Sequence, residues 1–546
     1  MANGHGQPII VLPESAFRTT GRNAQRNNIM AAKAVADIVR TTLGPRGMDK
    51  MLVDDIGDIV ITNDGATIVE EMNVEHPAAK MVVEVAKTQD KEVGDGTTTA
   101  VVLTGELLSS AEKLLDKGVH STIIARGYKM AADKSQEILN SIGGKVTLDD
   151  EALLKRVAET AMTGKGAESA KEALSDIAVN AVKKVVTVEK NKYSVDRDDI
   201  QIEKKQGGSI RDSELIEGVI LDKERASDGM PAKVENPKIM LIDVALEIKK
   251  TETDAKIRIT SADQLVSFTQ QEEKMLKEKA DAIINAGATA VFCQKGMDDL
   301  VIHYLMKGKV FAVKNVSESN MKRLAKATGG RVTSNLKELS KDDFGSAKTV
   351  EEKKLSGDEM IFVSGCKNPK SVAILIRGGT EHVVDEAERA VTDAVGGVSA
   401  ALEIGGAVAG GGACEMELAR QLRVYAESVS GREQLAINAF AESIEIIPRT
   451  LAESAGMDAI DTLVKLRSEH EKKGKNIGVA VTETKLDDMW KKGVIEPLKI
   501  KVQAIKSASE AAQMLLRIDD VIASSKKSPP MPPGGGMGGM GGMGEY

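Results

Sequence analysis

Aromatic residues and cysteines are scarce in this sequence. Only 2% of the 546 residues are aromatic, and the three cysteines are Cys293, Cys366 and Cys414. The cysteines lie far apart, form no CxxC pair and have no histidines at metal-ligand spacing. This excludes a disulfide framework or a zinc site and favours buried thiols in a reducing compartment. With so few aromatic residues, the core must be built from alanine, valine, isoleucine, leucine and the 23 methionines.

Long apolar runs and an excess of positive charge are also missing. The longest stretch of small residues, 390–414, contains Asp393, Glu403 and many glycines, so it does not predict a membrane span. The first fifteen residues have neither the basic flank nor the apolar stretch of a secretion signal. The net charge of -8 argues against a nucleic-acid-binding protein. We therefore expect a soluble, cytoplasmic protein.

The length of 546 residues predicts two to four domains. In the first third, apolar residues at helical spacing predict helices at 22–43 and 100–118, with Thr97 as a plausible N-cap of the second. Two short strands are expected within 51–65, around an Asp/Gly turn. Residues 151–186 predict two amphipathic helices separated by the loop MTGKGAE.

The remainder changes character several times. Residues 219–370 alternate buried strands with helices and predict a separate α/β domain, in which Ser261 caps a long helix that ends near Gly287. A regular Val/Ala stripe predicts a helix at 381–395, and helices are also expected at 412–470 and 507–523. The tail at 529–546 is rich in Gly and Met and is expected to be disordered.

Three glycine-rich segments lie at predicted helix ends: TTLGPRG (41–47), GDGTTTA (94–100) and VAGGGACE (408–415). Glycine lets backbone amides approach a phosphate, and a helix N-terminus supplies unpaired N–H groups. Asp95 would be a hard oxygen ligand for Mg²⁺ on such a phosphate. A turn that requires positive φ explains each segment alone more simply. The three segments together favour a nucleotide site about as strongly as they favour simple turns. Neither a Walker A loop nor a GxGxxG fingerprint is present.

Longer motifs carry a family resemblance. The segments LGPRGMDKML, NDGATI, GDGTTTAVVL, GGGACEMELA and IPRTLAESAG, together with TETDAKIRIT, VFCQKGMDDL and the Gly/Met tail, resemble the archaeal group II chaperonins of the thermosome type. The resemblance extends from about Gly6 to Val521, which is nearly the whole chain. It implies an ATP-driven protein-folding machine made of two stacked rings.

The resemblance also implies the chaperonin fold, with three domains nested in the sequence. A mostly α-helical equatorial domain, which binds ATP and forms ring contacts, would combine 1–147 with 405–546. An α/β intermediate hinge domain would combine 148–218 with 371–404. An α/β apical domain with a helical protrusion would span 219–370, in agreement with the α/β domain expected there from the strand and helix pattern.

Individual residues acquire roles from the same resemblance. Contacts to the phosphates and the nucleotide would come from Leu43, Gly44, Pro45, Gly96, Thr97, Thr98, Thr99, Gly410 and Gly411. Asp95 would hold Mg²⁺ and Glu496 would reach the ribose, with K⁺ a further candidate cofactor beside ATP and Mg²⁺. Asp64 and Asp393 would orient and activate the attacking water, while Lys165 would sense the γ-phosphate.

Asp393 and Lys165 depend wholly on the resemblance. Asp393 falls on the polar side of its predicted helix with Glu386 and Arg389, where a solvated face is the simpler explanation. A single lysine in a loop, such as Lys165, is usually solvent-exposed. Because Asp64 and Asp393 would belong to different domains, their assignment implies that hydrolysis requires domain closure.

The apical domain is expected to carry a lid and a surface for clients. Residues 247–276 resemble the helical protrusion that forms a built-in lid in group II chaperonins, with Leu265, Val266 and Phe268 near its apolar tip. An amphipathic helix packed on its own sheet is the simpler alternative. The implied partners are unfolded client proteins and identical or paralogous subunits in rings of eight, with nine per ring as the alternative. No separate lid co-chaperonin, nucleic acid or membrane is expected.

Four positions depart from the family pattern. Ala409 and Ser121 stand where proline is usual, and Ala480 and Thr484 replace an expected aspartate and glycine near the presumed adenine pocket.

Two other classes of function compete with a chaperonin. A small-molecule kinase or ligase could use the same glycine-rich turns, but it leaves the protrusion and the Gly/Met tail unexplained. A non-hydrolysing scaffold subunit would lack Asp64 or Asp393, and both are present.

Overall fold

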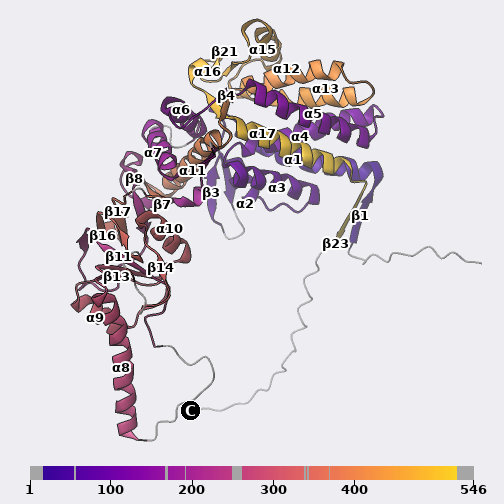
Figure 1. The fold of residues 1–546 in the computed structure, drawn as a ribbon. Coiled ribbons are helices and arrows are strands. Elements are labelled where there is room, and N and C mark those ends of the chain that lie inside the picture. The colour runs from indigo at the N-terminus through magenta and orange to yellow at the C-terminus, as the bar shows by residue number, and fades with distance from the viewer. Residues whose placement is uncertain are drawn as a thin grey trace, which may run out of the picture.

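The computed structural model describes residues 16–53, 57–165, 170–190, 192–248, 261–336, 340, 343–367 and 369–524. Within these ranges the chain forms three parts that follow one another along an elongated molecule (Figure 1). The tail expected at 529–546 and residues 249–260 of the expected protrusion lie outside the described residues. No helix in the described ranges is long and apolar enough to cross a membrane.

The first part is a helical body to which both ends of the chain contribute (Figure 1). Its N-terminal elements are β1 (Ala16–Thr20), α1 (Gly21–Arg40), β2 (Lys50–Val53), β3 (Ile59–Thr62), α2 (Gly65–Glu71), α3 (Pro77–Val93), α4 (Thr97–Asp116), α5 (Ser121–Ile142) and β4 (Gly144–Lys145). Its C-terminal elements are β19 (Gly406–Ala409), α12 (Ala413–Glu427), α13 (Glu433–Ile444), α14 (Ile446–Ser454), α15 (Ala459–Lys473), β20 (Ile477–Ala480), β21 (Lys485–Asp488), α16 (Met489–Lys492), β22 (Ile495–Pro497), α17 (Leu498–Leu516) and β23 (Asp520–Ser524). Buried side chains from the two ends, among them Leu103, Phe440 and Leu515, form one apolar core.

Two expectations for the helical body need correction. Helix α4 begins at Thr97, so the N-cap is Gly96, whose left-handed backbone (φ 79°) favours glycine over Thr97. The helix expected at 507–523 starts earlier, as α17 at Leu498, and ends at Leu516. The last residues of that range form β23 instead, because they pair antiparallel with β1 from the other end of the chain.

The second part covers the middle of the molecule and consists of helices on a small sheet. Its elements are α6 (Glu151–Met162), α7 (Lys171–Val185), β5 (Thr187–Glu189), β6 (Lys192–Ser194), β7 (Ile200–Gln206), β8 (Glu214–Ile216), β18 (Val372–Gly378) and α11 (Glu381–Ile404). Strand β18 lies between β7, to which it is parallel, and β8, to which it is antiparallel. Helix α11 is longer than expected, and its Val/Ala stripe is buried except at Val383.

The third part is an α/β unit with two sheets. Its elements are β9 (Gly218–Leu221), β10 (Lys233–Glu235), β11 (Lys238–Ile242), α8 (Ala262–Asn285), β12 (Ala290–Cys293), α9 (Asp299–Lys307), β13 (Phe311–Val313), α10 (Glu318–Thr328), β14 (Val332–Thr333), β15 (Gly345–Ser346), β16 (Thr349–Leu355) and β17 (Asp358–Ser364). One sheet has the order β13-β12-β11-β14 with parallel strands, and the other has the order β10-β16-β17-β9. Helix α8 projects from this part (Figure 1), and the Ser261 side chain caps it as expected.

Candidate functional site

A cavity of about 480 Å³ is lined by residues of the helical body and of the second part. Most of the residues singled out in the sequence line it: Leu43, Gly44, Pro45, Asp64, Asp95, Gly96, Thr97, Thr98, Thr99, Lys165, Gly411 and Glu496. Gly410 and Asp393 do not line the cavity, but each contacts a residue that does. Segments more than four hundred positions apart in the sequence therefore meet at one site.

Glycine turns and helix starts shape the wall of the cavity. Helices α2, α4 and α12 all begin at its lining, so their first N–H groups, which have no partner within the helix, are gathered there. Gly44 (φ 83°) and Gly96 (φ 79°) are both left-handed and tightly packed. An added Cβ would lie 2.4 Å from Leu451 Cδ2 or 2.5 Å from Ile500 Cγ2, respectively. The turns need glycine, and they also leave backbone amides exposed to a ligand.

Asp64 is held in a fixed orientation at the start of α2. Its Oδ2 accepts hydrogen bonds from the backbone N–H and the hydroxyl of Thr67, both at 2.9 Å, and the hydroxyl of Thr97 lies 3.4 Å from Oδ1. The Asn-Asp-Gly turn therefore orients Asp64 by ordinary N-cap chemistry, while Oδ1 remains on the side that faces α4.

Asp95 lies in the turn between α3 and α4. The backbone N–H of Gly96 donates to Asp95 Oδ1 at 2.7 Å, and the Gln89 side chain donates to the Asp95 carbonyl at 2.9 Å. Burial raises the pKa of the Asp95 carboxyl, and the positive charge of Lys165 opposes that rise. A half-buried carboxylate whose charged form is disfavoured by burial is a suitable ligand for a cation.

Lys165 and Asp393 form an ion pair beside the cavity. Lys165 lies in the loop after α6, and Asp393 on α11 is only 8% exposed. The explanation of Asp393 as part of a solvated polar face is therefore wrong. The amide of Asn63 also donates to the Gly164 carbonyl at 2.8 Å, so the turn that carries Asp64 is joined to the loop that carries Lys165.

Sequence reasoning missed two residues of the site. Lys501 of α17 lines the cavity and pairs with both Glu496 and the buried Glu415, and no motif marks it as functional. Asn63 Oδ1 is buried at the cavity and has no hydrogen-bond partner among the described residues. Its position in the Asn-Asp-Gly turn, next to Asp64, was the one signal that could have identified it.

The hairpin of β20 and β21 closes another side of the cavity. Val479, Ala480, Val481 and Thr482 line it, so the apolar Ala480 contributes to the wall at a position where an aspartate was expected from the sequence. Thr484, at the turn of the hairpin, has a left-handed backbone with φ 52°. Glycine adopts this conformation without strain, whereas a β-branched residue does not.

The residues present fit a magnesium nucleotide. Among the described residues, no group of three or more His, Cys, Asp or Glu side chains could hold a metal ion by itself. Mg²⁺ commonly takes one or two carboxylates and completes its ligands with phosphate oxygens and water. One half-buried aspartate beside several helix N-termini is therefore the donor set expected for such a group.

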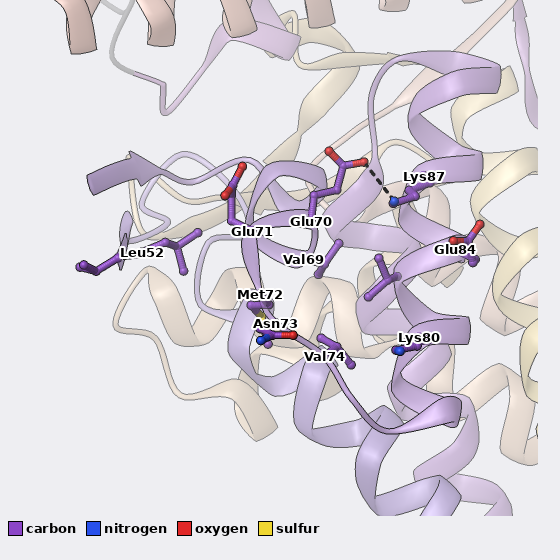
Figure 2. Close-up of a pocket in the computed structure, with 12 residues that line it drawn as sticks. Leu52, Val69, Glu70, Glu71, Met72, Asn73, Val74, Lys80, Glu84 and Lys87 are labelled. Carbon is purple, nitrogen blue, oxygen red and sulfur yellow. Dashed lines mark ion pairs between the residues drawn. The ribbon is translucent and has the colours of Figure 1, made fainter. Parts of the chain in front are cut away.

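A second cavity, of about 700 Å³, lies among β2, α2 and α3 (Figure 2). Its lining is half apolar and half polar or charged, and Glu70 and Lys87 of the lining are 4.0 Å apart. None of the site residues predicted from the sequence lines it. The adjoining β2–β3 hairpin exposes the apolar side chains of Met51, Val53, Ile59 and Ile61.

The predicted lid residues fall at the start of α8. Val266 is 55% exposed and Phe268 is 36% exposed, while the side chain of Leu265 lies outside the described residues. Farther along the helix, Leu276 and Ile283 are buried against the α/β unit. The first turns of α8 are therefore not packed on a sheet within the described part of the chain.

The three cysteines are free and buried, as the sequence indicated. Burial raises the pKa of Cys293 to about 11 and that of Cys366 to about 12. These thiols are protonated at neutral pH and unsuited to nucleophilic chemistry.

Comparison with known proteins gives one consistent result. A sequence profile of the TCP-1/cpn60 chaperonin family matches residues 35–526. A thermosome subunit of Methanopyrus kandleri is 58% identical over 97% of this chain and 97% of its own length. A thermosome subunit of Pyrococcus horikoshii is 60% identical over 96% of each chain. The open-state monomer of a group II chaperonin from Methanococcoides burtonii is similar in structure, with a TM-score of 0.59 and 48% identity over 78% of this chain and 100% of that chain.

Proposed function

The chain belongs to the TCP-1/cpn60 chaperonin family, and we propose that it hydrolyses ATP to drive the folding of client proteins inside a double ring. Its general function is that of an ATP-dependent chaperonin, and its fold is the multi-domain chaperonin fold. The single observation that carries the proposal is the Lys165–Asp393 ion pair, which joins two segments of the second part beside the cavity that Asp64 and Asp95 line.

The cavity would bind ATP through backbone and hydroxyl groups. The turns at Gly44, Gly96 and Gly411 and the hydroxyls of Thr97, Thr98 and Thr99 would contact phosphates. Leu43 and Pro45 would pack against the nucleotide, Gly410 would shape the wall through its contact with Glu496, and Glu496 would accept from the ribose. The helix N-termini at the lining support this arrangement, because their N–H groups and dipoles favour an anion.

Hydrolysis would need the groups of both parts. Asp64 and Asp393 would orient the attacking water and accept its proton, and Lys165 would contact the γ-phosphate. A contact between Lys165 and the phosphate would weaken the ion pair with Asp393. Nucleotide binding would therefore change the electrostatic environment of the Asp393 carboxylate. Phosphoryl transfer depends mainly on positioning and charge stabilisation, which such a set of side chains can supply.

Asp95 would hold Mg²⁺, which when bound supplies neutralisation of phosphate charge. K⁺ is a further proposed cation, for which the carbonyl and hydroxyl oxygens of the lining are suitable donors. The raised pKa of Asp95 supports a cation there, because a partly buried carboxylate is stabilised by a positive partner.

We assign the three parts of the fold to three domains. The equatorial domain would be 1–147 with 405–546, the intermediate domain 148–218 with 371–404, and the apical domain 219–370. Their apolar cores support this division, since among the described residues only Val146, Ala407 and Ile495 of the equatorial ranges join the core of the intermediate domain. The contacts of Asn63 with Gly164 and of Arg389 with the Ile61 carbonyl would be made on closure and broken on opening.

Subunits would assemble into two stacked rings in the cytoplasm, with eight or nine identical or paralogous subunits in each. The exposed apolar side chains of the β2–β3 hairpin support a contact between neighbours, because an exposed strand edge with apolar residues is a pairing site. The exposed Val266 and Phe268 support a lid built from residues 247–276, without a separate co-chaperonin. Unfolded proteins would bind the apical surface.

Light scattering in line with size-exclusion chromatography, run with and without Mg-ATP, tests the proposal together with an ATPase assay. We expect a particle with the mass of two multi-subunit rings and ATP turnover that stimulates refolding of a denatured client. A monomer or dimer in both runs, with phosphate transferred to a small acceptor, would instead support a kinase or ligase.

A further inference from the structure

A charged lysine lies under the candidate nucleotide site, between two glutamates. Lys501 Nζ is 2.7 Å from Glu415 Oε1 and also pairs with Glu496 Oε2. The side chains of Lys501 and Glu415 are 5% and 4% exposed, whereas that of Glu496 is 24% exposed and faces the cavity. The three residues come from α17, α12 and β22, so the cluster connects three elements at the cavity floor.

The surroundings fix the Glu496 carboxylate from both sides. Lys501 holds Oε2, and Gly410 lies so close to Oε1 that an added Cβ would be 2.6 Å away. Burial favours a neutral lysine, but the negative charges of Glu415 and Glu496 outweigh it and raise the pKa of Lys501. The ammonium therefore stays charged and keeps its two carboxylate partners in place.

The geometry points to Lys501 as a positioning residue that gives the site its selectivity for ribonucleotides over deoxyribonucleotides. We infer that Lys501 holds Glu496 with one acceptor oxygen toward the ribose hydroxyls. The ion pair with Glu415 fixes the position of the Lys501 ammonium when a nucleotide binds. The inference rests on the proposed function, since it requires a nucleoside triphosphate in the cavity. It adds the residue that makes the Glu496 contact rigid and therefore selective.

Competition binding with ATP, 2′-deoxy-ATP and 3′-deoxy-ATP, on assembled protein with Mg²⁺, tests the inference. A hydroxyl that donates to a fixed carboxylate contributes about 10- to 100-fold in affinity. We therefore expect the wild type to prefer ATP by about that factor over at least one deoxy analogue. The two analogues identify which ribose hydroxyl donates a hydrogen bond to Glu496.

The variants separate positioning from simple loss of structure. Lys501→Met should reduce the preference for ATP over the deoxy analogues to about the value for Glu496→Gln. In both variants the three nucleotides should bind with similar affinity. Because Lys501→Met leaves Glu415 buried without a partner, the double variant Glu415→Leu with Lys501→Met replaces the buried pair by apolar residues and preserves folding. Lys499→Met is the matched control, since Lys499 is on the same helix and pairs with Glu403 at 2.6 Å, away from the cavity lining.

Each outcome has a defined meaning. Loss of the preference in the double variant, with the control unchanged, supports the inference. A preference that persists in the double variant, or weaker binding of all three nucleotides by the same factor, overturns it and leaves Lys501 a structural residue. Failure of the wild type to bind ATP at all would instead refute the proposed function, and is distinguishable because the wild type is measured first.

Discussion

Lys165 and Asp393 are 228 positions apart in the sequence and form an ion pair beside the candidate site. The pair joins the loop after α6 to the middle of α11, so it depends on how these two segments are placed. Both segments belong to the second part, while Asp64 and Asp95 belong to the helical body. A change in the position of the second part relative to the body would therefore separate the groups proposed for water activation.

Replacing Asp393 with alanine should abolish hydrolysis without preventing assembly. We expect turnover to fall by about 10²- to 10⁴-fold, as for loss of a general base, while ring mass and ATP binding remain close to wild type. Single-turnover phosphate release and equilibrium nucleotide binding measure the two effects. Asp385→Ala is the control, because Asp385 lies on the same helix as Asp393 and its exposed ion pair is with Lys204 of β7. Normal turnover in Asp393→Ala would show that this carboxylate has no catalytic role.

Replacing Thr484 with glycine should stabilise the protein. Thr484 has a left-handed backbone and an exposed side chain, so the substitution removes strain and costs no packing. We expect a gain of about 1 kcal/mol, since the strain relieved exceeds the added flexibility of the unfolded chain. Calorimetry should show a higher Tm for Thr484→Gly than for Thr484→Ala, which keeps a Cβ in the same conformation. Equal or lower Tm values for the glycine variant would contradict the strain argument.

Glu417 should make stability depend on pH in the acid range. Burial raises the pKa of this carboxyl, but hydrogen bonds from His470, Arg420 and Gln421 outweigh it and hold the pKa at about 2. Because the folded pKa is below the ordinary value of about 4.3, the stabilisation is complete above pH 4.3 and is lost as the pH falls toward 2.

Glu417→Gln should therefore lower the free energy of unfolding by up to about 3 kcal/mol at neutral pH, and the difference from wild type should close toward pH 2. Calorimetric Tm values between pH 2 and 7 measure this difference. Glu427→Gln, at the exposed end of the same helix α12, should follow the wild type throughout. A gap between Glu417→Gln and wild type that is independent of pH would mean that packing, not charge, accounts for the loss.

The protrusion should be required for enclosure but not for ATP turnover. Deletion of residues 251–270 removes the exposed Val266 and Phe268 and leaves the nucleotide cavity untouched. We expect ATPase activity close to wild type and rapid digestion of a bound client by added protease. The double substitution Val266→Lys and Phe268→Lys should act in the same direction, with Gln270→Lys as the control. A client that stays protected in the deletion variant would refute the lid.

Local sequence patterns predicted the local parts of this fold well. The helical stripe of α1, the β2–β3 hairpin, the helix pair α6 and α7, and the Ser261 cap are all confirmed. Each depends on apolar period or cap chemistry that is complete within about twenty residues. The predicted N-cap at Thr97 was wrong by one position, because the N-cap is the left-handed Gly96. The spacing of apolar residues carries no information about a backbone angle.

Features that depend on partners far away in the sequence could not be predicted from local sequence patterns. Strand β23 followed a helical pattern and became a strand because β1 supplies its hydrogen bonds. Asp393 looked solvated until the loop that carries Lys165 was placed against it. Lys501 has no motif at all, since what makes it notable is a glutamate on each side from other elements. The family resemblance supplied Asp393, and only the fold supplied Lys501.

The pairing of β1 with β23 has a consequence for how the protein is made. Arg18 and Asp520 are hydrogen-bonded across 502 positions, and α17 packs against α3, α4 and α5. During synthesis the N-terminal helices cannot complete their packing until α17 and β23 have been made. The α/β unit in the middle of the chain can fold as it emerges from the ribosome. Glu496 and Lys501 also line the candidate site, so a nascent chain cannot complete the lining before α17 has emerged. The candidate site is therefore among the last features of the described fold to form.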